Sequence, residues 1–359
     1  EMSASLVGSE MCIRDRDDYE VFLKEVGADY YITSYYGAEE LGKLVAAFIR
    51  KKGQQEICHI ENLYYRERNS YQFTFQNTLP LQLEDAQVNW RSLEKYKKNY
   101  TMLRTSVSCP FQCAFCSYPT RTQKYECLSV DHVERQLDQL EKTHHTHMVN
   151  FVDDTFNVPK ARFKTLLEMM IHKRYSFQWH AFIRAQYLDE ETVSLMKQSN
   201  CQGVLLGIES GNQGQLDRMN KKVMLEQLEH GILLLKKYSI LTIGLFIVGF
   251  PGETENTVQD TVAFIQRLKP DFYSLEPWFY HRNTPIHKQR ALYGLKGAMH
   301  NWSHNTMSSS QVAPLIASAQ KQITDSICMS HLPYPYVFQL LDAGYSIEEI
   351  RDLFYEFHI

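Results

Sequence analysis

The chain has 359 residues, of which 44% are hydrophobic, 13% aromatic and 22% charged, and its formal net charge is −4. This is the composition of a globular protein that buries a sizeable core, and the acidic balance makes nucleic acid an unlikely partner. No apolar run reaches the roughly 18–20 residues that a membrane span needs, so we expect no membrane segment. Eight cysteines in a chain of this length do not suggest a disulfide framework, but their clustering suggests a metal in a reducing cytoplasm.

The first sixteen residues, EMSASLVGSEMCIRDR, fit no structural element and lack the apolar core of a signal peptide. Leu6 to Asp15 resemble one translated frame of a transposase sequencing adapter. We therefore treat residues 1–16 as an assembly artefact without function, Cys12 included, and expect the natural N-terminus to be missing. The alternative is a genuine disordered tail.

Residues 17–75 read as the end of an open α/β domain. A short aromatic strand over Tyr30–Ile32 leads through Gly37 into a helix whose apolar face repeats at i, i+3, i+4 and i+7. Residues 57–67 (ICHIENLYYRE) indicate a short β segment. One strand–helix unit cannot bury its own apolar face, so the sequence predicts a domain whose front half is absent. The polar residues 76–98 show no clear period, which predicts a linker.

From residue 99 to residue 290, strand-like and helical segments alternate. The expected strands are apolar runs at residues 100–106, 147–152, 177–183, 203–208, 241–250 and 272–280. Helical patterns lie between them. Continuous apolar strands joined by helices favour a parallel sheet covered on both faces. Six such units suffice for a partial (β/α)6 barrel of the TIM type, in which the chemistry lies at the carboxyl ends of the strands.

Polar residues and glycines follow the ends of these expected strands. The first strand is followed by Cys109, Cys113 and Cys116. The later strand ends carry, in chain order, Asp153 and Asp154, Arg184, Glu209 and Ser210, Gly249 and Gly252, and the segment EPWFYHRNTP. Because corresponding positions of successive units meet at one edge of such a sheet, the sequence predicts one shared cavity there.

The three cysteines stand in the run CPFQCAFC, with the spacing Cys-x3-Cys-x2-Cys. Thiolates suit iron–sulfur clusters, zinc or copper(I). A structural zinc site is closed by four ligands, commonly in two separated pairs, and no second pair of that kind is evident in the sequence. Three thiolates can hold three irons of a cubane cluster and leave the fourth iron open to a substrate or cofactor. Phe115 puts an aromatic ring beside that position, and zinc remains the alternative.

At these residues the chain resembles the radical S-adenosylmethionine (SAM) superfamily, whose hallmark is this cysteine spacing after the first strand of a (β/α)6 partial barrel. The resemblance covers about residues 100–290, because the order and spacing of the later motifs agree as well. It implies a 4Fe-4S cluster on Cys109, Cys113 and Cys116 that binds SAM and cleaves it reductively to a 5′-deoxyadenosyl radical. It further implies an electron donor such as flavodoxin or ferredoxin and a cytoplasmic location.

The same resemblance implies a role for the two aspartates after the second strand. The superfamily's strand-two motif contacts the amino group of SAM, and here the sequence DDTF stands at that place. We therefore expect Asp153 and Asp154 to pair with this ammonium group. The structural alternative is that one of them caps the next helix.

The resemblance also implies cofactor contacts for residues at the ends of the later strands. Arg184 is expected to pair with the SAM carboxylate, and Glu209, with Ser210 beside it, to accept ribose hydroxyls. The turn from Gly249 to Gly252 is expected to let the adenine approach the backbone. Their structural alternatives are an ion pair of Arg184 with a barrel carboxylate, a structural hydrogen bond of Glu209, and a simple turn at Gly252.

A narrower resemblance concerns the cobalamin-binding branch of this superfamily, in which a flavodoxin-like domain precedes the barrel. DDTF, GIESG and GFPGET are similar to that branch, and residues 27–49 resemble the last strand and helix of its flavodoxin-like domain. CSYPTRTQKY and NWSHNTM are similar to its P-methyltransferase-like group. The resemblance implies cobalamin in the full-length protein and methylation of a carbon or phosphorus centre in a small-molecule or natural-product pathway. Radical oxidation, cyclisation or rearrangement is the alternative outcome, and a non-catalytic zinc or redox-sensing protein is the alternative class.

Residues 291–359 show mainly helical patterns and predict a C-terminal cap near the substrate opening. Tyr280, Trp302 and His304 are candidate residues for the substrate side of the cavity. The alternative is that they buttress the barrel.

Overall fold

The computed structural model describes residues 23, 27–34, 37–51, 54–77, 83, 88–90, 99–118, 124–143, 145–330 and 333–357. The chain forms two compact units, Glu1–Gln82 and Leu83–Ile359, which are described separately. The expected artefact at residues 1–16 and most of the expected linker lie outside the described residues. Within the described part of the chain, no helix is long and apolar enough to cross a membrane.

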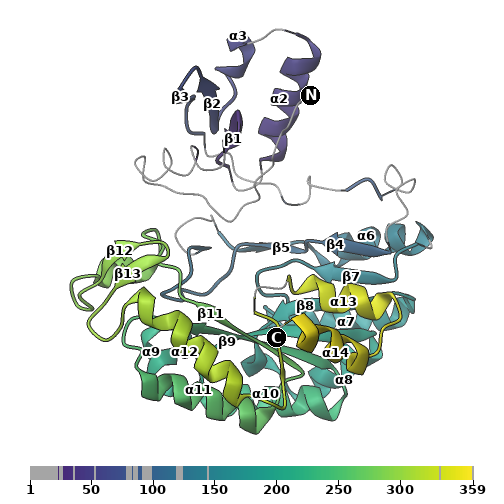
Figure 1. Ribbon diagram of the computed structural model, residues 1–359. Coiled ribbons are helices and arrows are strands. Elements are labelled where there is room, and N and C mark those ends of the chain that lie inside the picture. Colours follow the sequence, from purple (N-terminus) through teal and green to yellow (C-terminus); the bar gives the residue numbers. More distant parts are fainter. Residues whose placement is uncertain are drawn as a thin grey trace. The chain divides into compact units, whose positions relative to one another are not determined.

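The first unit contains a small sheet and an amphipathic helix (Figure 1). Its elements are β1 (Tyr30–Ile32), α2 (Ala38–Ile49), α3 (Gln54–Ile57), β2 (Leu63–Glu67) and β3 (Ser70–Phe73). β1 pairs antiparallel with β2, and β2 pairs antiparallel with β3. The expected strand and helix are therefore present. The described strands do not show the parallel pairing of a flavodoxin-like sheet.

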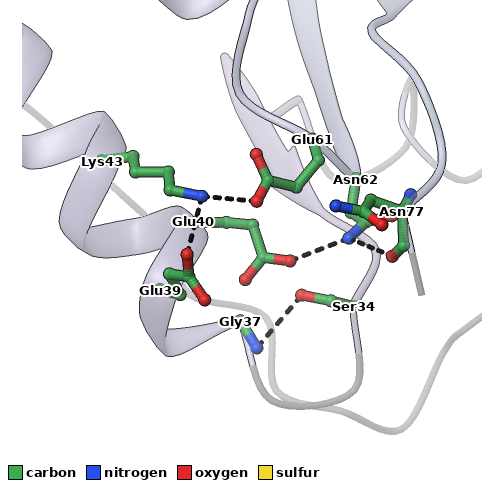
Figure 2. A network of polar contacts seen from close by, with 8 residues as sticks. All are labelled: Ser34, Gly37, Glu39, Glu40, Lys43, Glu61, Asn62 and Asn77. Carbon is green, nitrogen blue, oxygen red and sulfur yellow. Dashed lines mark hydrogen bonds and ion pairs between the residues drawn. The ribbon is translucent and has the colours of Figure 1, made fainter. Parts of the chain in front are cut away.

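Buried polar contacts join α2 to the turn before β2 (Figure 2). The Asn62 amide donates from Nδ2 to Glu40 Oε1 and to the Asn77 carbonyl, both at 2.9 Å. Its Oδ1 accepts from the Asn77 backbone N–H, also at 2.9 Å. Lys43 forms an ion pair with Glu61 in the same network. A buried polar group is costly unless it is paired. This network therefore helps to fix α2 against the hairpin, in addition to the apolar packing between them.

The second unit is built on a seven-stranded sheet in the order β14-β11-β10-β9-β8-β7-β4. All six neighbouring pairs are parallel. The strands are β4 (Tyr100–Leu103), β7 (Met148–Phe151), β8 (Gln178–Ile183), β9 (Cys201–Glu209), β10 (Leu241–Val248), β11 (Phe272–Pro277) and β14 (Ile327–Cys328). The six strands expected from the sequence are confirmed, and the two-residue β14 adds an unexpected seventh.

Helices alternate with these strands and lie along one face of the sheet (Figure 1). They are α6 (Val130–Thr143), α7 (Lys160–Lys173), α8 (Glu190–Gln198), α9 (Gln213–Arg218), α10 (Leu225–Lys237) and α11 (Glu255–Leu268), with a short 3₁₀ turn, η4 (Ala185–Tyr187), after β8. On this outer face Trp179 packs edge-on against Phe163 of α7, and Phe246 against Phe264 of α11. Successive side chains of a strand alternate between faces, so Leu205 and Ile243 belong to the opposite, inner face.

The C-terminal region is more varied than the helical cap that the sequence predicts. It contains η5 (Pro285–Gln289), a hairpin of β12 (Lys296–Ala298) and β13 (Asn301–Ser303), α12 (Ser309–Gln322), α13 (Pro335–Asp342) and α14 (Ile347–Phe357). Phe338 of α13 and Phe354 of α14 share one buried cluster with Ile243 and Phe272. Phe338 and Phe354 therefore pack on the inner face where β10 and β11 begin, and the expected position of this region near the substrate opening stays a prediction.

Candidate functional site

The three cysteines lie between two short strands that pair antiparallel, β5 (Ser106–Val107) and β6 (Glu126–Cys127). Cys113 is buried, and Cys109 and Cys116 are partly exposed. The loop turns back on itself, because the Cys116 N–H donates to the Cys113 carbonyl at 3.1 Å. Burial raises the pKa of Cys116 to about 12, and the neighbouring thiols of Cys113 and Cys109 add to this rise. The three thiols therefore share one electrostatic environment.

The donor set of three thiols in one loop fits a cubane cluster, which takes one thiolate on each iron. Among the described residues, no group of three or more His, Cys, Asp or Glu side chains lies close enough together to hold one metal ion. A cubane cluster takes one thiolate on each iron, so its cysteine ligands stand farther apart than the ligands of a lone zinc. Three cysteines in one turn-forming loop therefore suit three separate irons.

A segment between α9 and α10 holds the cysteine loop from one side. The Ala114 N–H donates to the Met219 carbonyl at 2.7 Å, and Asn220 Nδ2 donates to the Gln112 carbonyl at 2.6 Å. Lys221 Nζ lies 5.8 Å from the centre of the Phe115 ring. This segment, residues 219–222, did not stand out in the sequence. Its signal, if any, is Asn220, a residue type that tolerates the positive φ of 52° found there.

Glu209 ends β9 and forms a buried ion pair with Lys221. Lys221 Nζ donates to Glu209 Oε1 at 2.6 Å, and their side chains are 7% and 10% exposed. Gly207 makes room for the pair, because a Cβ there would stand 2.7 Å from Glu209 Oε1 and 3.1 Å from Lys221 Nζ. The expected ribose acceptor thus also has a structural partner.

Arg184 follows β8 and is buried between the cysteine loop and residues 219–222. Its Nη2 donates to the Lys221 carbonyl at 2.5 Å, and its guanidinium stacks 3.8 Å above the Phe111 ring of the cysteine loop. Asn157 holds the Arg184 backbone by accepting from its N–H at 3.0 Å and donating to its carbonyl at 2.9 Å. The guanidinium also donates to the side-chain amide oxygen of Gln186, from Nε at 3.0 Å. Its described partners are therefore two amide oxygens and an aromatic ring, where the sequence suggests a carboxylate.

Asp153 and Asp154 follow β7 and differ in their surroundings. The Asp153 carboxylate is buried and accepts from the Thr105 N–H at 2.6 Å, the Thr105 hydroxyl at 2.5 Å and the Ser106 N–H at 2.9 Å. Burial raises the pKa of Asp153, and these donors act against the rise. Asp154 is partly exposed, and its charge contributes to the raised pKa of Cys116. Neither caps α7, whose N-cap is Pro159 without a side-chain bond.

The turn after β10 requires glycine at two positions. Gly249 has φ 98° and Gly252 has φ 91°, both in the left-handed region. The Gly249 N–H donates to Glu253 Oε2 at 2.9 Å, and burial raises the pKa of Glu253 to about 7. Sequence reasoning missed this buried carboxyl. Ser210, at the end of β9, is buried and accepts from the Asn212 N–H at 3.2 Å.

The three candidates for the substrate side are buried, and Trp302 and His304 lie against the same turn at Gly249. Trp302 Nε1 donates to the Trp278 carbonyl at 2.9 Å, and the Trp302 ring stacks on His304. His304 Nε2 lies 3.0 Å from the Gly249 carbonyl oxygen. The Tyr280 hydroxyl lies 2.6 Å from His287 Nδ1. The packing of Trp302 and His304 is consistent with the alternative in which they buttress the barrel, and the substrate role of all three residues stays a prediction.

Comparisons with known proteins agree with this arrangement. Residues 103–265 match the model of the Radical SAM superfamily. An uncharacterized methyltransferase of Pyrococcus horikoshii is 30% identical over 184 residues, which are 50% of this chain and 40% of that protein. Bacteriochlorophyllide d C-12(1)-methyltransferase of Chlorobaculum tepidum is 30% identical over 186 residues, again 50% of this chain and 40% of that protein. The chain thus spans about two fifths of the length of these relatives.

A solved structure has the same fold. It is the radical S-adenosylmethionine methyltransferase TsrM from Kitasatospora setae with cobalamin and a [4Fe-4S] cluster bound. Its TM-score is 0.66 at 15% identity, and the match covers 94% of this chain and 80% of that chain. At this identity the likeness concerns the fold alone.

Proposed function

The chain belongs to the radical SAM superfamily, since residues 103–265 form a radical SAM domain, and we propose that it is a radical SAM methyltransferase. The observation that carries the proposal is one loop with three thiols, held at the carboxyl side of a parallel sheet next to a partly exposed aspartate. In parallel β/α folds this edge carries the chemistry.

Cys109, Cys113 and Cys116 hold a 4Fe-4S cluster in this proposal. When bound, the cluster supplies the electron that cleaves SAM to a 5′-deoxyadenosyl radical. Asp154 is the better partner for the SAM ammonium group, because the Asp153 carboxylate already accepts three hydrogen bonds. Phe115 flanks the cofactor on the side of the cysteine loop.

The other cofactor contacts come from the later strand ends. The ribose lies near Glu209 and Ser210, and the adenine lies near the positive-φ turn from Gly249 to Gly252. Arg184 orders the site by joining residues 219–222 to the cysteine loop. Its guanidinium is therefore a poorer partner for the SAM carboxylate than the sequence suggests.

Methyl transfer in the full-length protein uses cobalamin and acts on a carbon or phosphorus centre of a small molecule. Support comes from two relatives that are named methyltransferases and from a fold relative that holds cobalamin. Residues 17–75 precede the barrel at the place of a flavodoxin-like cobalamin domain, although their described strands pair antiparallel. A flavodoxin or ferredoxin supplies electrons in the cytoplasm.

A second candidate function keeps the radical chemistry without methyl transfer. An anaerobic magnesium-protoporphyrin IX monomethyl ester cyclase of Rubrivivax gelatinosus is 28% identical over 202 residues, 53% of this chain and 36% of that protein. Its name describes a cyclisation. The same loop and strand ends serve either outcome, so only the product separates them.

Anaerobic reconstitution of the full chain with iron and sulfide tests the proposal. We expect about four irons per chain, the number in a cubane cluster, and SAM cleavage to 5′-deoxyadenosine under a strong reductant. Replacing Cys113 with alanine should abolish both. SAM labelled in its methyl group then separates the two functions when candidate substrates are supplied with cobalamin. Absence of iron uptake by the wild-type chain contradicts both functions, and a product without label contradicts methyl transfer.

A further inference from the structure

A buried lysine stands beside the cysteine loop, although neither strand ends nor cysteine spacing points to it. Lys221 is 6% exposed, its Nζ is paired with Glu209, and the same Nζ faces the Phe115 ring at 5.8 Å. We infer that Lys221 sets the reduction potential of the cluster by placing a fixed positive charge behind the cysteine loop. This inference rests on the proposed function, because it presupposes the cluster.

Several contacts fix the position of this charge. The residues on either side of Lys221 have positive φ, 52° at Asn220 and 56° at Lys222. The Lys221 carbonyl accepts from Arg184, and Asn220 donates to the carbonyl of Gln112 in the cysteine loop. Left-handed backbone is costly for residues other than glycine, so two such residues in three positions indicate a segment held by its surroundings.

The surroundings also let the charge act on the cysteine loop. Burial removes most of the water and salt that would screen the ammonium group. The segment that carries Lys221 contacts the cysteine loop directly at Ala114 and Gln112. The Glu209 carboxylate, which is paired with Lys221, carries the opposite charge. A cluster bound by this loop is therefore reduced next to the positive charge of Lys221, which the Glu209 carboxylate partly offsets.

Reduction adds one negative charge to a cluster, so a nearby cation favours the reduced form. A buried ion pair is weak evidence for a purely stabilising role, because apolar residues of similar volume are often as stable. Lys221 thus stabilises the reduced cluster after an external low-potential donor has delivered its electron. It acts through the cluster without touching the substrate. It transfers no proton.

The test is a redox titration of the reconstituted chain without SAM, followed by electron paramagnetic resonance. Lys221→Met should lower the ratio of reduced to oxidised cluster on the order of tenfold at a given potential, which corresponds to about 59 mV for one electron. Lys222→Met is the matched control. It removes the same charge from the next residue, whose side chain is exposed, and we expect its potential to stay near that of the wild type.

Glu209→Gln should shift the reduction potential in the opposite direction, because it leaves the charge of Lys221 without its carboxylate partner. We expect the potential of this variant to rise above that of the wild type. Should Lys221→Met fail to retain iron, Glu209→Gln still decides the question, and an unchanged potential would overturn the inference. The double variant Lys221→Met/Glu209→Gln removes both charges, and its potential should lie between those of the single variants.

Two failures are distinguishable in this design. If the wild-type chain takes up no iron, the proposed function fails before any variant is compared. If iron content and spectrum are normal in every variant and Lys221→Met matches Lys222→Met in potential, only the inference about Lys221 fails.

Discussion

Replacing Asp153 with alanine should weaken the fold of the second unit more than it alters a cofactor contact. The Asp153 carboxylate accepts two backbone N–H groups and one hydroxyl at distances between 2.5 and 2.9 Å. The two N–H groups, of Thr105 and Ser106, cannot turn towards water, whereas the Thr105 hydroxyl can rotate. An unsatisfied buried donor costs about 1–3 kcal/mol, so the two backbone groups alone predict a loss of about 2–6 kcal/mol.

Urea unfolding of the full chain, followed by tryptophan fluorescence, measures this loss. Asp153→Asn should lose much less, because its amide oxygen can accept from both backbone N–H groups, which share Oδ1, and the Thr105 hydroxyl can rotate to accept from its NH₂ group. Asp154→Ala is the control next to it and should leave the free energy of unfolding within about 0.5 kcal/mol, since Asp154 is partly exposed. If Asp153→Ala keeps full stability and instead abolishes SAM cleavage, the structural reading of Asp153 is wrong.

Three further changes test other parts of the second unit. Burial raises the pKa of Glu253 to about 7 in the folded protein, above the 4.5 of an ordinary glutamate. Below pH 4.5 this carboxyl is protonated in both the folded and the unfolded protein. As the pH rises from 4.5 to 7, the free energy of unfolding of the wild type relative to Glu253→Gln should therefore fall by about 3 kcal/mol, measured by urea unfolding at each pH. His180 has its pKa lowered by burial to about 3, so its imidazole signals in nuclear magnetic resonance should not titrate between pH 7.5 and pH 5, and its stabilising contribution should fall as pH drops from 6.5 towards 3. Gly231→Ala should destabilise the unit by about 1–3 kcal/mol in thermal unfolding despite a helix-propensity gain of about 1 kcal/mol, because its Cβ would stand 2.5 Å from the Ala185 carbonyl oxygen. Gly42→Ala in α2, where nothing lies within 4 Å of the new Cβ, should show the gain alone.

The long strands were predictable because they are continuous apolar runs. β10 (Leu241–Val248) and β9 (Cys201–Glu209) are buried on both faces, so hydrophobicity alone marks them. β14 consists of Ile327 and Cys328 only, and two residues carry no period. The hairpin of β12 and β13 depends on Gly297 at φ 82°, which approaches the Asn301 carbonyl too closely for a side chain, and such an approach is not visible in sequence.

The place of the site was predictable, but the partners of its charged residues were not. Cysteine spacing and the order of strand ends locate the loop and the edge. Whether a carboxylate meets a cofactor or a backbone N–H depends on contacts between residues far apart in the chain, such as Asp153 with Thr105. Lys221 was missed for the same reason, since it stands in a helix connection whose composition resembles any exposed turn.

The charged residues at the sheet edge act on the cysteine loop from two directions. Asp153 holds Thr105 and Ser106, just before the loop, while Arg184 stacks on Phe111 within it. A loop held at one point can still pivot about that point, whereas a second contact removes this freedom. A cluster with one open iron needs such rigidity, because the position of the open iron follows from the positions of the three thiolates that hold the others. The buried Asp153 and Arg184, which the sequence marks as cofactor ligands, therefore have a structural role in fixing the loop, and their contacts with SAM stay a prediction.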